Sequence, residues 1–283
     1  VRGRKDLEDL SIPFIGEIPQ YFSKERKLGF KRKKQSYMKT IVVKEGSRDI
    51  INEAFRVLRS NMDFMAGKDK GQNVFVLTSF NPGSGKSFLT MNIAMSFAIK
   101  KKRILVIDGD LRHGSVSSYV DSPRIGLSDY LGNRVENWKE IIVADKKYDN
   151  LHILPIGTVP PNPTELLEDG KLATLIGALR GEYDYIFIDC PPIDIVADAQ
   201  IIEKLADRTI FVVRSGLLDR GMLPELENIY QEKRFRNLSV ILNGTESAGG
   251  RYSYRYGYRY GYRYGYHNGY SSYYGSKGEM GGG

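Results

Sequence analysis

Two glycines, a lysine and a serine follow one apolar run in a pattern suited to binding phosphate. The run Val74–Thr78 leads into residues 79–87, Ser-Phe-Asn-Pro-Gly-Ser-Gly-Lys-Ser, and then into a helical pattern. Glycines let the main chain turn its amides towards phosphate oxygens, and the N-terminus of the following helix adds positive charge. Lys86 can reach the β- and γ-phosphates of a nucleotide, and the Ser87 hydroxyl can ligate magnesium. The predicted nucleotide contacts here are Pro82, Gly83, Ser84, Gly85, Lys86, Ser87 and Phe88.

Three carboxylates stand at the ends of two further apolar runs. Asp108 and Asp110 follow one run, and Asp189 follows the other. Magnesium prefers oxygen ligands and keeps several waters, so one or two carboxylates beside the phosphates are enough to hold it. An Asp at a single strand end is common in turns, but three strand ends of this kind, one with Lys86 and Ser87, indicate a metal–phosphate site. The sequence therefore predicts bound ATP and Mg²⁺, with Ser87, one carboxylate of the first pair, and Asp189 near the ion.

Apolar runs rich in β-formers alternate with helical patterns between Asn73 and about Thr245. Short, near-continuous apolar strands separated by helices predict a parallel sheet covered on both faces. Ligands of such sheets bind beyond the carboxyl ends of the strands, where the groups above fall. The predicted fold is α/β, of the P-loop NTPase type, with a central, mostly parallel sheet and helices on both faces. The expected strands are Val74–Thr78, Arg103–Ile107, Leu151–Pro155, Tyr185–Ile188, Thr209–Val213 and Ser239–Leu242.

The chain divides into three regions by composition. Residues 1–40 form a polar lead with a basic run at 31–34, residues 41–246 form the predicted ATP-binding domain, and residues 247–283 form a tail. The net charge of +8 is concentrated in the lead and the tail, which is typical of a solvated or membrane-facing segment rather than a base-reading surface. The tail repeats Arg, Tyr and Gly with almost nothing aliphatic, so it cannot build a packed core, and disorder is predicted.

A helix is predicted over residues 47–66, with Ser47 as its cap. Within it, Arg56 and Arg59 lie three residues apart, a spacing that by itself is typical of a solvated face. The apolar face of this helix is expected to contain Ile50, Ala54, Val57, Leu58 and Met62.

Several classes of protein are disfavoured by composition. Cys190 is the only cysteine, so no disulfide forms within the chain and a reducing compartment fits. The histidines His113, His152 and His267 lack the spacing of metal ligands. No apolar run approaches the length of a membrane span. The sequence does not begin with Met, so we expect a soluble fragment whose membrane anchor lies elsewhere.

Five segments together resemble the cytoplasmic domain of the bacterial tyrosine kinases (BY-kinases) found in polysaccharide co-polymerases. Residues 82–87, 107–112 and 188–192 match the Walker A, A′ and B motifs of that family. Residues 53–59 fit its E-x-x-R-x-x-R helix, and residues 155–167 fit its P-x-G…P-N-P-x-E-L-L stretch. The likeness covers roughly residues 5 to 275 and includes a C-terminal cluster of tyrosines. It departs from the family at the sixth loop residue, which is serine where the family usually has glutamate, and in a tail that is unusually regular.

The resemblance implies a protein tyrosine kinase that uses ATP and Mg²⁺ and phosphorylates itself between subunits. It implies that Lys86 holds the transferring phosphate and that Asp108 takes the proton of the acceptor hydroxyl. Asp110 is then the metal ligand, together with Asp189 and Ser87. The residues alone do not separate the roles of Asp108 and Asp110.

Three further residues are candidates at the same site. Asn243 ends the last strand, where related ATPases place an asparagine that recognises adenine, and Arg214 ends the preceding strand. Arg112 can either stabilise charge on the transferring phosphate or form a salt bridge.

The resemblance also implies a cellular setting at the cytoplasmic face of the inner (cell) membrane, in the control of capsule and exopolysaccharide synthesis and export. It implies a ring-like homo-oligomer in contact through Glu53, Arg56 and Arg59. A transmembrane part of the same polypeptide or a partner anchor is expected, as is a cognate phosphotyrosine phosphatase, and no nucleic acid. The predicted phosphoacceptors are Tyr252, Tyr254, Tyr256, Tyr258, Tyr260, Tyr262, Tyr264, Tyr266, Tyr270, Tyr273 and Tyr274.

Other interpretations of these features remain open at this point. Phe80 stands where the strict phosphate-loop pattern has glycine, so an ordinary glycine-rich turn is one alternative. A partition or division-site ATPase of the ParA/MinD type is another, although those proteins carry a signature lysine where this chain has Asn81. The Arg/Tyr/Gly repeat is also compatible with a nucleic-acid binder or with a flexible spacer.

Overall fold

The computed structural model describes residues 1–21, 40–66, 71–193 and 197–246. The described residues between Val1 and Glu246 form one unit. The basic run at 31–34 and the tail at 247–283, with the disorder predicted for it, lie outside the described residues.

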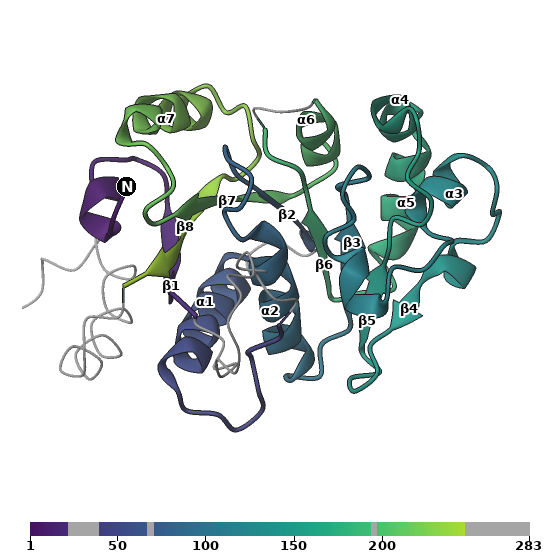
Figure 1. The fold of residues 1–283 in the computed structure, drawn as a ribbon, viewed down its shortest axis with the longest axis horizontal. Helices are drawn as coiled ribbons and strands as arrows, with labels where there is room; N and C mark the ends of the chain where they lie inside the picture. The colour runs from purple at the N-terminus through teal and green to yellow at the C-terminus, as the bar shows by residue number, and fades with distance from the viewer. Residues whose placement is uncertain (22–39, 67–70, 194–196, 247–283) are drawn as a thin grey trace, which may run out of the picture. The chain divides into compact units, whose positions relative to one another are not determined.

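A mostly parallel sheet of eight strands runs through the described part of the chain (Figure 1). The strand order is β1-β8-β7-β2-β6-β3-β5-β4, and the neighbours are parallel except for β4 and β5. All six predicted strands are present, five of them within one residue at each end, and the predicted fold class is confirmed. The strands are β1 Phe14–Pro19, β2 Val74–Thr78, β3 Ile104–Asp108, β4 Val143–Ala144, β5 Leu151–Leu154, β6 Tyr185–Asp189, β7 Arg208–Arg214 and β8 Ser239–Thr245.

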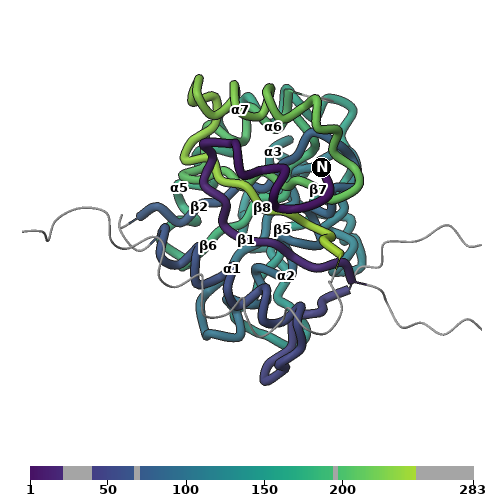
Figure 2. Tube along the Cα trace, turned by 90° about the vertical axis from the view of Figure 1, so that its left-hand side faces the viewer, coloured from purple at the N-terminus to yellow at the C-terminus, as the bar shows by residue number. Residues whose placement is uncertain are grey.

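Helices cover both faces of the sheet (Figure 2). The helices α1 and α2 pack on one face, whereas α3 to α7 lie on the other. They are α1 Ile50–Ala66, α2 Lys86–Ala98, α3 Leu127–Leu131, α4 Pro163–Glu168, α5 Lys171–Leu179, α6 Asp198–Glu203 and α7 Leu223–Gln231. Short 3₁₀ turns are η1 Arg4–Leu7, η2 Ser117–Val120, η3 Trp138–Ile141 and η4 Arg220–Met222.

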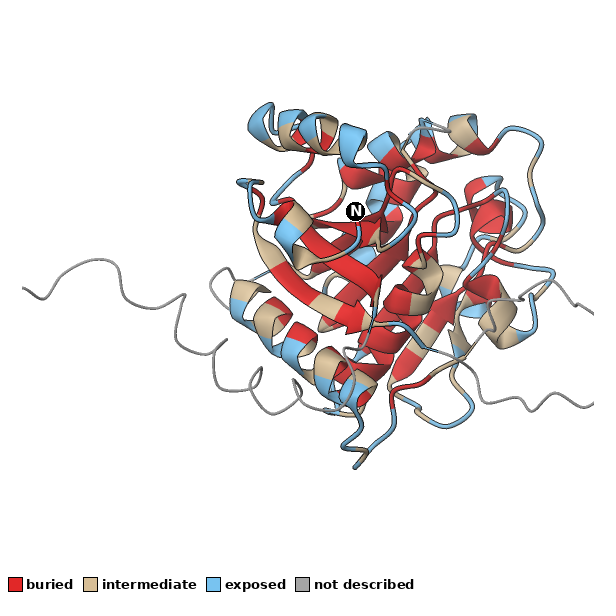
Figure 3. Ribbon diagram, turned by 60° about the vertical axis from the view of Figure 1, so that its left-hand side comes forward, coloured by how far each residue is buried: buried red, intermediate tan, exposed pale blue. Residues whose placement is uncertain are grey.

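The central strands β2, β3 and β6 are buried along their whole length, because helices cover both sides of them (Figure 3). Alternate side chains of a strand point to opposite faces, so Phe75 and Phe187 pack under α2 while Val76 and Ile188 pack under the other helices. The ring of Phe187 lies 5.6 Å from that of Phe75 and 5.6 Å from that of Phe97 in α2. This packing fixes α2 against the strands whose ends carry the predicted site.

The first 21 residues belong to the sheet domain rather than to a separate lead. β1 pairs in parallel with β8, and the Gln20 amide donates to the Thr245 carbonyl at 2.8 Å. The boundary expected at residue 40 therefore does not divide the described structure. The strand was not predicted because Gly16 and Pro19 are poor strand formers, which an edge position tolerates.

The N-terminus of α1 is capped by Asp49, not by Ser47. The Oδ1 atom of Asp49 accepts a hydrogen bond from the main-chain amide of Asn52 at 2.8 Å. The Ser47 hydroxyl instead donates to the Asp49 carboxylate at 2.7 Å. A carboxylate cap also suits the positive end of the helix dipole, which explains why the helix begins after this residue.

The buried face of α1 differs in part from the predicted one. Leu58 and Met62 are fully buried as expected. Ile50 and Val57, which were predicted to be on that face, are 53% and 40% exposed, and Phe64 is 59% exposed. The helix therefore leaves an apolar stripe in solvent, with one residue every seven positions.

Candidate active site

The ends of β2, β3 and β6 lie side by side at one edge of the sheet. Asp108 is paired in register with Asp189, and Leu77 of β2 is paired with Asp189 from the other side. The Gly109 amide donates to the Asp189 carbonyl at 2.8 Å, and a Cβ at Gly109 would come within 2.9 Å of that oxygen. Glycine is needed for this close approach. The structure thus brings the phosphate loop and both predicted acidic strand ends together.

The loop between β2 and α2 has the shape of a phosphate cradle. Gly83 and Gly85 have φ angles of +77° and +89°, which glycine adopts at little cost. Because α2 begins immediately afterwards, its first main-chain amides are available to an anion held by the loop. Phe80, which replaces the glycine of the strict pattern, packs edge-on against Phe211 with ring centroids 4.8 Å apart. Its ring is buried and belongs to the hydrophobic core.

Replacing Gly85 with alanine is expected to destabilise the protein more than replacing Gly83. Positive φ costs either alanine variant on the order of 1 kcal/mol. A Cβ at Gly85 would also lie 2.3 Å from Asn243 Nδ2, whereas nothing lies within 4 Å of a Cβ at Gly83. Overpacking should add about 1–3 kcal/mol to the loss in Gly85→Ala, measured by urea unfolding without nucleotide. Equal losses in the two variants would contradict this packing, and Asn243→Ala should relieve part of the Gly85→Ala defect.

The ammonium group of Lys86 lies inside the site. The residue is 9% exposed, and Nζ donates to Ser79 Oγ at 3.3 Å. Burial lowers the pKa of this lysine, whereas the negative charges of Asp189 and Asp110 oppose the shift. Charged partners of this kind favour the protonated form, so Lys86 can offer a positive charge to a phosphate.

Asp189 connects the end of β6 to the start of α2. Its Oδ2 atom accepts a hydrogen bond from Ser87 Oγ, which places the two predicted metal ligands in contact. Burial raises the pKa of Asp189 to about 6, while the Ser87 hydroxyl and the charge of Lys86 act in the opposite direction. With a pKa of about 6, the Asp189 carboxyl group is mostly ionised at neutral pH but gains a proton in mild acid.

Asp108 is held by a residue that the sequence did not point to. Its Oδ2 atom accepts hydrogen bonds from the Ser117 amide at 2.6 Å and from the Ser117 hydroxyl at 2.7 Å. The same hydroxyl accepts from the Ile156 amide at 2.8 Å, which ties η2 to the loop after β5. Burial, followed by the charge of Asp189, raises the pKa of Asp108 to about 7. No local pattern marks Ser117, because the contact arises only when the turn folds back over the strand end.

The carboxylates fit a divalent cation. Asp108 Oδ1 and Asp189 Oδ1 are buried, and neither accepts a hydrogen bond in the described part of the chain. A buried acceptor without a partner is costly unless a ligand satisfies it. Asp110 lies nearer the surface, where its carboxylate contacts the His113 amide at 3.2 Å and the His113 ring at 3.1 Å. With Ser87 and nucleotide phosphates, these oxygen donors suit Mg²⁺.

Binding of magnesium and ADP is expected to strengthen as the pH rises from about 5.5 to about 8, because Asp108 and Asp189 must ionise to attract the cation. The effect on stability has the opposite sign. Because both pKa values are raised in the folded state, to about 7 and about 6, the native state holds protons that the unfolded state has released. The contribution of these two groups to stability therefore falls from about pH 4 to about pH 7.

Isothermal titration at a series of pH values measures the binding effect. ADP without magnesium is the control and should bind with much less dependence on pH. A magnesium-dependent affinity that is flat across this range would show that the two carboxyl groups are ionised throughout.

Arg112 forms a salt bridge, which is one of the two roles that the sequence left open for it. Its Nε is 3.1 Å from Oδ2 of Asp198, whose side chain is only 1% exposed. The Thr164 hydroxyl donates to the other oxygen of the same carboxylate at 2.6 Å. Asp198 and Thr164 thus tie the loop after β3 to α4 and α6. Neither residue was predicted, although Thr164 lies within the P-N-P-x-E-L-L stretch that the sequence singled out.

The two adenine candidates lie on neighbouring strands: Arg214 ends β7, whereas Asn243 lies two residues before the end of β8. Arg214 of β7 is paired with Asn243 of β8. Asn243 is 1% exposed, and its Nδ2 donates to the Ser84 carbonyl at 2.8 Å. The asparagine therefore supports the phosphate loop directly, and its contact with adenine stays a prediction.

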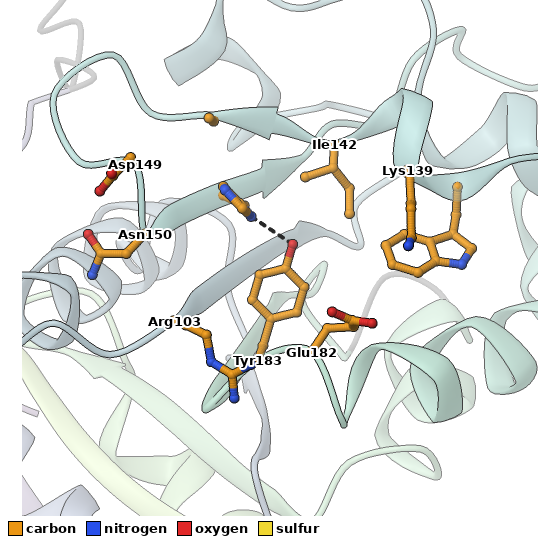
Figure 4. Close-up of a pocket in the computed structure, with 10 residues that line it drawn as sticks. Arg103, Lys139, Ile142, Asp149, Asn150, Glu182 and Tyr183 are labelled. Carbon is orange, nitrogen blue, oxygen red and sulfur yellow. Dashed lines mark hydrogen bonds between the residues drawn. The ribbon is translucent and has the colours of Figure 1, made fainter.

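A cavity of about 640 Å³ lies away from these strand ends. Its lining includes Arg103 and Asn150, which precede β3 and β5, together with Trp138 of η3. Tyr183 also lines it, with its hydroxyl 2.7 Å from His152 Nδ1 (Figure 4). None of the predicted nucleotide or metal residues lines this cavity, so the candidate active site is the phosphate loop with the adjacent acidic strand ends.

The chain is similar to known proteins over most of its length. A family model for an AAA domain matches residues 72–234. Tyrosine-protein kinase YwqD of Bacillus subtilis (strain 168) is 30% identical over 218 residues, which are 76% of this chain and 91% of the relative. Tyrosine-protein kinase CpsD of Streptococcus agalactiae serotype III (strain NEM316) is 31% identical over 202 residues, 71% of this chain and 85% of the relative. This chain belongs to the bacterial tyrosine-protein kinase family.

The likeness to this kinase family extends to three dimensions. The kinase domain of Escherichia coli tyrosine kinase ETK matches with a TM-score of 0.73 at 26% identity, over 97% of this chain and all of that one.

A Klebsiella pneumoniae relative from a cps region is 33% identical over 244 residues, which make up only 33% of its length. Within the described residues, no helix has the length and apolar character needed to span a membrane.

The residues predicted to join subunits of this kinase lie on α1. Glu53 and Arg56 form an ion pair that is partly exposed. Arg59 Nη1 donates to the Ser96 carbonyl at 2.8 Å, in the last turn of α2. A cation at this position compensates the unsatisfied carbonyls of a helix end. Arg59 therefore has a role within the chain that the motif alone did not indicate, and its contact with a second subunit stays a prediction.

Proposed function

We propose that this kinase transfers the terminal phosphoryl group of ATP to tyrosine hydroxyls, including those of its own C-terminal tail. The observation that carries the proposal is a single cluster at three adjacent strand ends. It combines the phosphate loop and Lys86 with the paired groups of Ser87 and Asp189 and with the buried carboxylate of Asp108. The relatives that match along most of their length are named tyrosine-protein kinases, which supports the choice of acceptor.

Each group has a role in this transfer. The acceptor oxygen bonds to the γ-phosphorus as the bond to the β,γ-bridging oxygen breaks, and ADP is the leaving group. Positioning and charge neutralisation provide nearly all the catalysis in such reactions. We assign Lys86 and the loop amides to the phosphates, and Asp108 to the acceptor proton, because a pKa of about 7 suits a base at neutral pH. Magnesium, held by Ser87, Asp110 and Asp189, would neutralise charge on the phosphates.

The proposal includes transfer between subunits of a ring-like homo-oligomer. Three exposed apolar residues of α1, Ile50, Val57 and Phe64, recur every seven positions, which is about two helical turns. They share this helix with the ion pair of Glu53 and Arg56. An apolar stripe beside charged groups supports a contact through α1.

The proposed cellular role is control of capsule or exopolysaccharide synthesis and export at the cytoplasmic face of the inner membrane. A membrane anchor, in the same polypeptide or in a partner, would hold the kinase there. A cognate phosphotyrosine phosphatase would return the tail to its unmodified state.

A mixing experiment tests the activity and its direction together. Wild-type protein is incubated with magnesium, ATP and a heavy-isotope-labelled Lys86→Met chain, which retains the tail. We expect mass spectrometry to find phosphotyrosine on the labelled tails, and none when the unlabelled wild type is omitted. Modification of unlabelled chains alone would indicate transfer within one chain. ATP hydrolysis without any modified tyrosine would favour a ParA/MinD-type ATPase switch.

A further inference from the structure

We propose that a basic pocket beside α1 binds the phosphotyrosines of the C-terminal tail after the kinase has modified them. The pocket has a volume of about 260 Å³ and lies between the segment before α1, α1 itself and the end of α2. Its lining contains the cationic side chains of Lys44, Arg56, Arg59 and Lys100, and one carboxylate, that of Glu45. The inference rests on the proposed tyrosine kinase activity, which would supply the ligand.

The four cations of this pocket differ in how they are held. Arg56 and Arg59 are both half-buried. Arg56 is ion-paired with Glu53, and Arg59 is hydrogen-bonded to the end of α2, so both guanidinium groups are fixed in position. Lys44 and Lys100 are exposed, and neither ammonium has a hydrogen bond or ion pair among the described residues. Fixed guanidinium groups beside two unpaired ammonium groups provide several donors for one anion.

The electrostatics and the walls of the pocket favour an aryl phosphate. Burial lowers the pKa of Arg59, and the charge of Arg56 lowers it further against the opposing effect of Asp63. A bound anion would offset this unfavourable burial of positive charge. A phosphate monoester brings about −1.5 to −2 charges and three acceptor oxygens. Val43 and Ile99 also line the pocket, and they offer apolar contact to the ring that carries the phosphate.

The tail of this chain has the charge properties that such a switch requires. Residues 247–283 contain five Lys or Arg side chains and one carboxylate, which is a net charge of +4. The unmodified tail is therefore repelled by the basic pocket, and about three phosphates reverse its charge. Because Arg56 and Arg59 belong to the helix proposed as the subunit contact, a tail bound in the pocket competes with that contact.

A synthetic peptide tests the pocket without depending on the kinase reaction. The probe has the sequence of residues 255–266 with Tyr260 phosphorylated and a fluorescent label. Its anisotropy is measured with the phosphatase-treated 283-residue chain in saturating Mg–ADP, which occupies the active site. We expect saturable binding that is about tenfold or more weaker for the unphosphorylated peptide. The Lys44→Glu/Lys100→Glu chain should lose a similar factor, whereas Lys102→Glu, an exposed lysine outside the pocket, should bind as wild type does.

Several outcomes would overturn the inference. One is equal affinity of the phosphopeptide for wild type and for Lys44→Glu/Lys100→Glu, and another is equal affinity of wild type for the two peptides. A third is displacement of the probe by inorganic phosphate at the concentration at which the unlabelled phosphopeptide displaces it. A preference for vesicles containing anionic lipid, with no binding of the phosphopeptide, would assign the pocket to a membrane surface instead. Thermal unfolding confirms that each variant is folded. A chain that binds the phosphopeptide but phosphorylates no tyrosine supports the pocket and refutes the proposed reaction.

Discussion

Replacing Lys86 with methionine should lower the rate of tyrosine phosphorylation by a factor on the order of 10²–10³. Methionine has a similar length and fills the same buried position, but it brings no charge to the transferring phosphate. Only interactions that strengthen in the transition state accelerate the chemistry, and the Lys86 ammonium is placed to make one. Timed assays with radiolabelled ATP and phosphotyrosine detection measure the loss.

The matched control is Lys102→Met, which removes an exposed lysine just after α2 and should leave the rate unchanged. Urea unfolding of both variants separates a chemical defect from a folding defect. A Lys86→Met chain that is folded and retains its activity within about tenfold would remove this lysine from the mechanism.

Asp108→Asn is expected to lower kcat by a factor on the order of 10²–10⁴ with a smaller effect on KM. The amide oxygen can still accept the hydrogen bonds from Ser117, so the strand end should keep its shape, but the amide cannot take a proton from the acceptor. Asp189→Asn should instead weaken magnesium-dependent nucleotide binding, because Asp189 contacts Ser87. Steady-state kinetics as a function of ATP and magnesium distinguish the two patterns.

The dependence on pH gives an independent readout for Asp108. Wild-type kcat should rise through about pH 7 as the carboxyl loses its proton, and this rise should be absent in Asp108→Asn. The variant should also unfold at a higher temperature than wild type at pH 8 without nucleotide, because it no longer buries a charge. A larger loss of kcat in Asp110→Asn than in Asp108→Asn would exchange the roles assigned to these two residues.

The parts of the fold that the sequence predicted are those that local physics determines. The six strands found from sequence are apolar over nearly their whole length, since helices cover them on both sides. β1 was not predicted, because it pairs with residues of β8 more than two hundred positions away and its own amino-acid composition does not indicate this pairing. The exposed side of α1 was misjudged for a related reason. Ile50 and Val57 are as apolar as Leu58, and only the packed structure shows which of them faces the sheet.

The residues of the candidate site also fall into two groups, those that the local sequence predicts and those that only the folded structure reveals. Lys86, Ser87 and the acidic strand ends follow from the order of strand, loop and helix, and the structure brings them together. Ser117 and Asp198 were not found, because each acts through a side-chain contact across a turn or between loops. Asn243 was identified for adenine by resemblance alone, and the structure adds that it also supports Ser84 of the phosphate loop.

The parallel pairing of β1 with β8 has a mechanical consequence. Both strands leave the sheet at the same end, where Gln20 and Thr245 share a main-chain hydrogen bond. If the C-terminal end of β1 were pulled away from the C-terminal end of β8, the hydrogen bonds between the two strands would break one after another, beginning at that end. Counted from that end, the pair Pro19 and Thr245 comes first and the pair Ile18 and Asn243 comes second. A pull of modest force would therefore reach the asparagine that braces the phosphate loop before it disturbed the centre of the sheet.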